Sequence, residues 1–165
     1  MLHLIVGLPG AGKTTLARQL EAELPALRLT PDEWIGPLYG ESLAPAQLDA
    51  VRDPVESVQW SVAERALMLG LQVILDFGFW TRGEREAFRA RAAALGAGSR
   101  VHALVLPVEE LWARIEGRNA VLPAHTFRIA REQLEKWCTL FEPPTADELD
   151  TRPPSNPPAR GGETQ

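Results

Sequence analysis

The sequence predicts an α/β fold built on a parallel β-sheet, and two observations indicate it. Short apolar runs rich in branched side chains alternate along the chain with longer segments of helical period. The first apolar run is followed directly by a glycine-rich turn and a helix, the order of a parallel strand that enters a right-handed crossover. Ligands bind such sheets beyond the carboxyl ends of the strands, so we expect the functional site there.

Four strands are expected, and the apolar runs that indicate them are residues 2–6, 26–30, 71–76 and 100–107. Helical spacing covers residues 13–24, 44–70, 81–96, 108–119 and 126–140, with residues 31–40 as a loop or short helix. Pro54 should kink or split the second of these helices, and Thr126 is a candidate cap for the last.

A single domain is expected over residues 1–150, because a chain of 165 residues that is 45% hydrophobic can bury one good core. Residues 151–165 are rich in proline and glycine and have no apolar periodicity, which predicts a disordered tail. The formal net charge of −5 argues against a protein that coats DNA or an anionic membrane. With one cysteine and no apolar run long enough to span a bilayer, we expect a cytoplasmic protein with no obligate protein partner.

The segment GLPGAGKT matches the pattern G-x-x-x-x-G-K-[ST] and stands between a strand and a helix, the context that this motif requires. Backbone N–H groups of such a loop, together with the helix N-terminus, cradle the phosphates of a nucleoside triphosphate such as ATP. Lys13 should reach the β- and γ-phosphates, and the Thr14 hydroxyl should ligate Mg²⁺. The nucleotide-binding residues that we expect are Gly7, Leu8, Pro9, Gly10, Ala11, Gly12, Lys13, Thr14 and Thr15.

Two aspartates follow strands and are candidates for chemistry on the phosphate. Asp32 comes just after the second strand and could accept the proton of an acceptor hydroxyl, although Pro-Asp-Glu is also common capping chemistry at a helix start. Asp76 ends the run VILD and is a candidate for holding Mg²⁺ or positioning substrate, with a turn or cap aspartate as the alternative. An ionised side chain that closes a buried strand is costly without a partner, which favours a site role for Asp76.

Four arginines are further candidates. Arg114 and Arg118 share one helix face that leads into a loop, and they could neutralise charge on the transferring phosphoryl group. Arg82 and Arg85 could contact substrate or phosphate, with ordinary solvated ion pairs as the alternative.

In their order and spacing, the segments GLPGAGKTTLA, LTPDEW, VILDFGFWTRGERE, LWARIEGRN and FEPPTADE resemble the small P-loop kinases. That group includes polynucleotide 5′-hydroxyl kinase, chloramphenicol phosphotransferase, gluconate kinase and zeta-type toxins, and the closer resemblance is to its bacterial AAA-type members. The resemblance implies a three-layer α/β/α P-loop NTPase fold with about five parallel strands, Mg-ATP, a lid that carries arginines and an acidic general base after the second strand. The roles would fall on Lys13, Thr14, Asp32, Asp76, Arg114 and Arg118. The lid, around residues 119–125, is short, and only the segment that ends in FEPPT is left to supply a fifth strand.

The expected function is transfer of the γ-phosphate of Mg-ATP to a hydroxyl group of a small molecule, such as an antibiotic, sugar or metabolite, with Asp32 as general base. Trp34 and Trp80 could line the acceptor pocket, beside the substrate contacts proposed for Asp32, Asp76, Arg82 and Arg85. A polynucleotide or nucleoside 5′-hydroxyl is the alternative acceptor, although the chain has only two lysines. A nucleotide-hydrolysing regulatory switch is the alternative function.

Overall fold

The computed structural model describes residues 1–40, 43–121 and 127–154. The elements in chain order are β1 (Leu2–Val6), α1 (Lys13–Glu23), β2 (Ala26–Leu29), α2 (Pro31–Tyr39), α3 (Pro45–Met68), β3 (Gln72–Gly78), α4 (Arg82–Ala94), β4 (Ser99–Ala103), α5 (Val108–Val121), α6 (Arg131–Leu140) and α7 (Ala146–Leu149). The strands form one sheet in the order β2-β3-β1-β4, and every neighbouring pair is parallel. The predicted α/β fold with a parallel sheet is therefore confirmed, with four strands in the described part of the chain.

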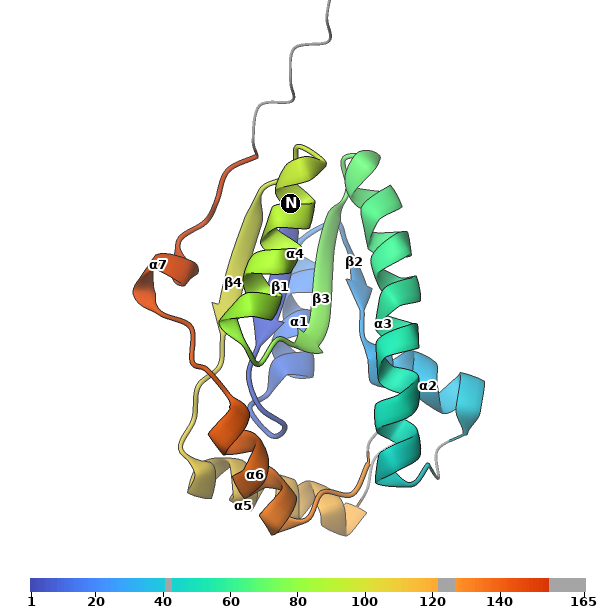
Figure 1. Cartoon of the computed structure of the whole chain (residues 1–165), viewed down its shortest axis with the longest axis vertical. Helices are drawn as coiled ribbons and strands as arrows, with labels where there is room; N and C mark the ends of the chain where they lie inside the picture. The colour runs from blue at the N-terminus through green and yellow to red at the C-terminus, as the bar shows by residue number, and fades with distance from the viewer. Residues whose placement is uncertain (41–42, 122–126, 155–165) are drawn as a thin grey trace, which may run out of the picture.

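Helices cover both faces of the sheet, which gives three layers (Figure 1). On one face α1 packs over a small buried cluster of Ile5, Ala17 and Ile74. On the other face α3 and α4 pack over the larger core, to which β1 contributes Leu4 and β3 contributes Leu75. Side chains of a strand point alternately to the two faces of the sheet. Because helices cover both faces, β1 and β3 consist mainly of consecutive apolar residues.

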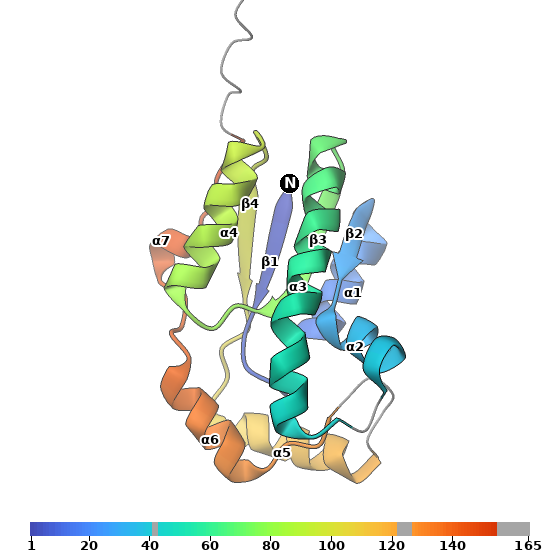
Figure 2. The ribbon, with the colours of Figure 1, turned by 45° about the vertical axis from the view of Figure 1, so that its right-hand side comes forward.

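Helices α5 and α6 lie across the carboxyl end of the sheet, as two views agree (Figures 1 and 2). A second apolar cluster holds them there, in which Leu111 and Ile115 of α5 and Leu134 of α6 pack with Leu8 and Ala11 of the glycine loop. These two helices therefore form the lid over the rim where the site is expected. The lid predicted at residues 119–125 includes the last residues of α5, and the remainder lies outside the described residues.

The fifth strand implied by the resemblance is not among the described residues. After α6 the chain instead runs along the outer edge of β4 as a strap, residues 141–154, which includes α7 (Figure 1). In the described part of the chain this strap meets the sheet at one antiparallel bridge, where Arg152 and Ser99 exchange backbone hydrogen bonds of 2.8 and 2.9 Å. Gly98 permits the approach, since a Cβ atom there would lie 2.8 Å from the Arg152 carbonyl oxygen. The two prolines of FEPPT lack the N–H groups that a sheet ladder requires, which explains why this segment forms no strand.

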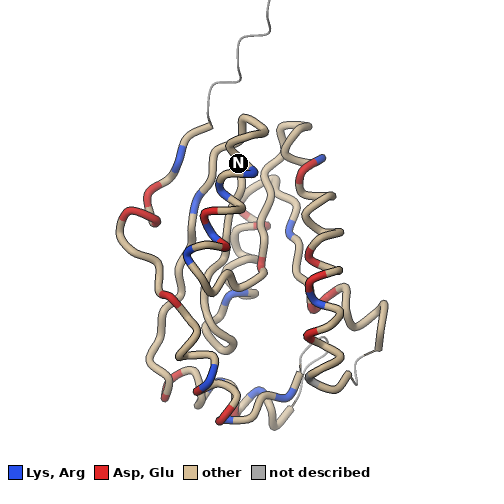
Figure 3. Tube along the Cα trace, in the orientation of Figure 1, with Lys and Arg blue, Asp and Glu red and all other residues tan. Residues whose placement is uncertain are grey.

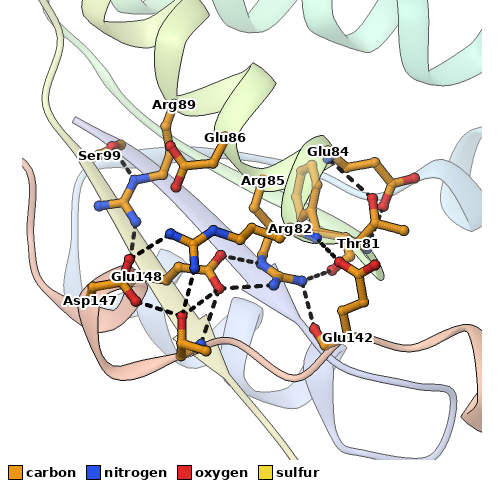
Figure 4. A network of polar contacts seen from close by, with 12 residues as sticks. Thr81, Arg82, Glu84, Arg85, Glu86, Arg89, Ser99, Glu142, Asp147 and Glu148 are labelled. Carbon is orange, nitrogen blue, oxygen red and sulfur yellow. Dashed lines mark hydrogen bonds and ion pairs between the residues drawn. The ribbon is translucent and has the colours of Figure 1, made fainter.

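Side chains of α4 fix the strap (Figure 4). Arg85 is fully buried and donates hydrogen bonds of 2.7 and 3.0 Å to the two carboxylate oxygens of Glu148. Arg89 donates to the Ser99 hydroxyl and to the Glu148 carbonyl oxygen, at 3.2 and 2.6 Å. The Arg85 guanidinium lowers the pKa of Glu148 to about 2, so this buried carboxylate stays charged at neutral pH.

Two local predictions have a definite outcome. Helix α3 runs through Pro54 without being split, and residues 31–39 form the short helix α2, which was one of the two structures expected there. The cap predicted at Thr126 lies outside the described residues, and α6 begins at Arg131. The segment predicted as a disordered tail, residues 151–165, includes Arg152, which is bridged to Ser99, whereas residues 155–165 lie outside the described residues. None of the described helices is long and apolar enough to cross a bilayer.

Candidate active site

The glycine loop has the backbone geometry that phosphate binding needs. Gly10 and Gly12 have φ values of 83° and 97°, a region that favours glycine. A Cβ at Gly10 would also lie 3.0 Å from Ile115 of the lid, so a side chain there would push α5 away. Helix α1 begins at Lys13, and no side chain caps its first turn. The N–H groups of this first turn and the positive end of the helix dipole therefore face the loop, as an anion site requires.

Lys13 lies at the centre of the charged groups. Its ammonium group donates a 3.1 Å hydrogen bond to the Leu8 carbonyl oxygen, inside its own loop. Burial lowers the pKa of Lys13, and the charges of Asp76 and Asp32 oppose that decrease. Both predicted carboxylates are therefore close enough to act on Lys13, and a bound phosphate could take the place of the carbonyl oxygen as its partner.

Thr14 and Asp76 form a pair suited to a cation. The Thr14 hydroxyl donates a 2.8 Å hydrogen bond to Asp76 Oδ2, while Asp76 Oδ1 is buried and has no hydrogen-bond partner among the described residues. Burial raises the pKa of the Asp76 carboxyl, and Lys13 and Thr14 oppose the increase. The described residues hold no group of three or more His, Cys, Asp or Glu side chains that could bind a metal alone. A hydroxyl and a carboxylate with a free oxygen fit Mg²⁺, which takes one or two protein ligands, phosphate oxygens and water.

Asp32 lies in the first turn of α2 and faces the same cleft as the glycine loop. Its Oδ1 accepts a 2.7 Å hydrogen bond from Arg52 of α3, which fixes the orientation of the carboxylate. Arg52 also lies 3.7 Å from Glu56, one helical turn further along α3. Burial raises the pKa of Glu56 to about 7; the charge of Arg52 opposes this increase, and neighbouring carboxylates add to it.

Neither Arg52 nor Glu56 was a sequence candidate. Their spacing of four on a predicted helix was a visible signal for an ion pair on one helix face. The sequence did not show that this face of α3 turns toward Asp32, because that depends on how α2 and α3 pack together.

The glycine loop, Asp32, Asp76 and the lid surround one cleft of about 1030 Å³. Arg114 and Arg118 line it from α5, as the sequence predicted, but they differ in their partners. Arg114 is exposed and pairs with Glu110 at 2.6 Å. Arg118 is half-buried, its Nε atom has no partner among the described residues, and Nη2 is 3.4 Å from the Phe127 carbonyl oxygen. Arg128, which was not among the residues predicted from the sequence, also lines the cleft.

The remaining candidates divide between this cleft and other places. Trp80 lines the cleft and packs against Trp137 of the lid at a ring distance of 5.5 Å. Trp34 does not line it and faces a separate apolar hollow of about 550 Å³ between α2 and α3. Arg82 and Arg85 also lie outside the cleft lining, because their side chains bind Asp147 and Glu148 of the strap. The structure therefore does not bring Trp34, Arg82 or Arg85 to the lining of the cleft that holds the glycine loop.

Comparison with known proteins places this geometry in a family. No curated protein matches the sequence. A chain of the Pnkp1/Rnl/Hen1 RNA repair complex has a similar fold, with 22% identity and a TM-score of 0.70 over 96% of this chain and 50% of that chain. This chain thus spans half the length of that relative.

Kti12 from Chaetomium thermophilum, solved in complex with ADP-AlF3, matches with 22% identity and a TM-score of 0.66, over 88% of this chain and 82% of that one. A gluconokinase from Sinorhizobium meliloti 1021 matches with 15% identity and a TM-score of 0.59, over 89% and 78%. At these identities the likeness establishes the P-loop fold. The sequence model of an AAA domain matches residues 2–144, and the chain therefore belongs to the AAA domain family.

Proposed function

We propose that this protein is an ATP-dependent phosphotransferase, which moves the γ-phosphoryl group of Mg-ATP to a hydroxyl group of a small molecule. One observation carries the proposal: Asp32 shares a single cleft with the glycine loop and acts electrostatically on Lys13. A carboxylate in that position can take a proton from an acceptor hydroxyl that approaches the γ-phosphate.

The donor side of the cleft binds the nucleotide. The N–H groups at the start of α1 hold the phosphates, and Lys13 exchanges the Leu8 carbonyl oxygen for a phosphate oxygen. Thr14 and Asp76 are the residues that would hold Mg²⁺, which neutralises charge on the phosphates when bound. Arg118 brings to the same cleft a guanidinium whose Nε has no partner among residues 1–40, 43–121 and 127–154, and there it stabilises charge on the transferring group.

The reaction then needs one proton acceptor. The acceptor oxygen forms a bond to the γ-phosphorus, the bond from that phosphorus to the β–γ bridging oxygen breaks, and ADP leaves. The proton of the acceptor hydroxyl passes to Asp32, whose carboxylate Arg52 holds in place through Oδ1. Asp32 Oδ2 is the oxygen that this ion pair leaves for the acceptor.

The acceptor side of the cleft is acidic, which favours a neutral or cationic acceptor. Asp53 and Glu56 of α3 and Glu84 of α4 line it. The charges of Asp53, Glu84 and Asp32 all raise the pKa of Glu56, against the single opposing charge of Arg52. Figure 3 shows that acidic positions outnumber basic ones along α3. An amine-bearing molecule would be attracted to these carboxylates and a neutral polyhydroxyl molecule would not be repelled, whereas the phosphates of a nucleic-acid strand would be repelled.

A polynucleotide 5′-hydroxyl remains the second candidate acceptor, because the fold resembles a chain of an RNA repair complex. Arg114 and Arg128 on the lid side of the cleft would then have to hold the nucleic-acid phosphates. The two acceptor classes predict opposite charge preferences in the same assay.

The test is a transfer screen with γ-labelled ATP and Mg²⁺, offering amino sugars, neutral sugars, nucleosides and 5′-hydroxyl oligonucleotides. We expect label on a neutral or amine-bearing acceptor, and its loss in Lys13→Ala and Asp32→Ala. Asp147→Ala is the matched control, since this exposed aspartate lies on the strap and pairs with Arg82. If only the oligonucleotides become labelled, the acceptor is a polynucleotide 5′-hydroxyl and the small-molecule assignment is wrong. Phosphate release without any labelled acceptor that persists in Asp32→Ala would instead indicate a nucleotide-hydrolysing switch.

A further inference from the structure

Thr30 occupies a helix-capping position without capping the helix. It is the N-cap residue of α2, where a threonine hydroxyl ordinarily accepts a hydrogen bond from the first turn, and here it makes no such bond. A cap of this kind usually contributes about 1 kcal/mol of stability. The side chain is buried and turns back toward the sheet, so something other than the helix determines its orientation.

Two neighbours fix Thr30 from both ends. Arg28 of β2 donates a 2.6 Å hydrogen bond from Nη1 to the Thr30 hydroxyl oxygen. Gln59 of α3, which is fully buried, donates a 3.1 Å bond to the Thr30 carbonyl oxygen. Arg28 is held in turn by Glu21 of α1 and Glu33 of α2, at 2.8 and 3.0 Å. Thr30 is thus the end of a bonded chain that ties α1, α2, α3 and β2 together.

This arrangement decides which way the Thr30 proton points. A guanidinium has only donors, so the Thr30 oxygen must be the acceptor from Arg28 and its own hydrogen is left to donate. The acceptor within reach is Asp76 Oδ2, at 3.5 Å. That contact is longer than the 2.8 Å bond from Thr14 to the same oxygen, but both groups are buried.

The two hydroxyls therefore converge on one oxygen of Asp76. Thr14 and Thr30 both donate to Oδ2, and Oδ1 has no hydrogen-bond partner in the described part of the chain although it is buried. A buried carboxylate oxygen without a partner is costly, unless a ligand completes it. The positive charge of Arg28 also favours the ionised form of Asp76 by lowering its pKa.

We propose that Thr30, fixed by Arg28, is a positioning residue that holds Asp76 with Oδ1 free for Mg²⁺ or a magnesium-bound water. This inference rests on the proposed nucleotide site, and it gives Thr30, which lines the same cleft, a role in metal affinity. Residues that orient a metal ligand typically change metal affinity by about 10- to 100-fold when they are removed.

The experiment measures ADP binding by calorimetry with and without Mg²⁺, so that the gain in affinity due to the metal is obtained without any acceptor. In Thr30→Val, which removes the hydroxyl at nearly constant volume, we expect that gain to fall by about tenfold. ADP affinity without the metal should stay within about twofold of wild type. Thr30→Ser, which keeps the hydroxyl, should restore the gain. Thr139→Val is the control, since this exposed threonine of α6 donates its hydroxyl hydrogen to the Lys136 carbonyl oxygen of its own helix.

Each outcome decides a separate claim. An unchanged magnesium gain in Thr30→Val overturns the positioning role and leaves the proposed function intact. An equal loss in Thr30→Ser and Thr30→Val also overturns it, because the hydroxyl would then be irrelevant. If ADP affinity without Mg²⁺ falls by as much as ADP affinity with Mg²⁺, Thr30 only maintains the structure of the loop. Absence of any magnesium gain in the wild-type protein would refute the proposed Mg-nucleotide site, and this inference with it.

Discussion

Replacing Glu56 with glutamine should stabilise the protein at neutral and alkaline pH and have almost no effect in acid. The Glu56 side chain is only 24% exposed and faces Arg52 at 3.7 Å, which is too far for a close ion pair. Its pKa is raised to about 7 from an ordinary 4.5, first by burial and then by nearby carboxylates. Between these two pH values the native state holds a proton that the unfolded chain has lost, so stability falls as the pH rises through this interval.

The magnitude follows from the same two values. Each pH unit between a native and an unfolded pKa corresponds to ~1.4 kcal/mol, so the full interval gives a penalty of ~3 kcal/mol above pH 7. Glutamine resembles the protonated acid and should remove most of this penalty. In a domain of this length, ~1 kcal/mol shifts the melting temperature by roughly 2–4 °C, so Glu56→Gln should melt about 6–12 °C higher at pH 8.

The assay is thermal unfolding of wild type and Glu56→Gln at pH 4 and pH 8, with Glu64→Gln as the control on the same helix but outside the cleft lining. The difference between Glu56→Gln and wild type should be near zero at pH 4, where both states of the wild-type chain are largely protonated. An equal difference at both pH values, or a lower melting temperature at pH 8, would refute the reasoning. Either result would mean that the ionised carboxylate is well solvated or well paired in the cleft.

Three further results are expected. Arg85→Met leaves the buried Glu148 carboxylate without its partner and should lower the free energy of unfolding, measured in urea, by about 3–5 kcal/mol. Arg82→Met breaks an exposed ion pair and should change this free energy little. Equal decreases in the two variants would contradict the role of the buried network. Burial lowers the pKa of His102 to about 4, so as the pH falls the unfolded chain binds a proton at this histidine before the folded protein does, and the free energy of unfolding should decrease between pH 6.5 and 4. In His102→Gln the free energy of unfolding should change less with pH in this range. An unchanged pH dependence would show that His102 is not its cause. Arg118→Ala should lower kcat by about 100-fold with a small change in KM for ATP, and a change in KM alone would assign Arg118 to nucleotide binding.

The nucleotide side of the site could be predicted from local sequence. The strand, the glycine loop and the helix start lie within residues 2–14, and their backbone geometry depends on neighbours in the chain. Gly10 and Gly12 adopt positive φ there, and Lys13 and Thr14 begin α1 as the motif requires. Asp76 could be placed at the same rim because parallel strands end on one side of a sheet.

The acceptor side could not be predicted in this way. Arg52 meets Asp32 across 20 residues of chain, and this contact requires α2 and α3 to pack at one particular angle. Arg85 is the converse case: the sequence places it on a helix with several other charged residues, where an arginine is usually solvated. Here it is buried, since Glu148, 63 residues later, satisfies its charge.

The sequence by itself determined the parallel α/β fold, the phosphate loop and the placement of the strand ends along one rim, because short-range sterics and apolar periodicity specify the elements locally and parallel strands end on one side of a sheet. Only the tertiary structure decided that the chain after α6 becomes a strap in place of a fifth strand, with Gly98 admitting the Arg152 backbone. It also decided which charges share the cleft: Asp32 with Arg52 and Glu56 inside it, and Arg85 outside. The physical reason is that a charged side chain takes its role from the partner that it meets in space, and that partner lies at a distance in the chain that no local pattern records.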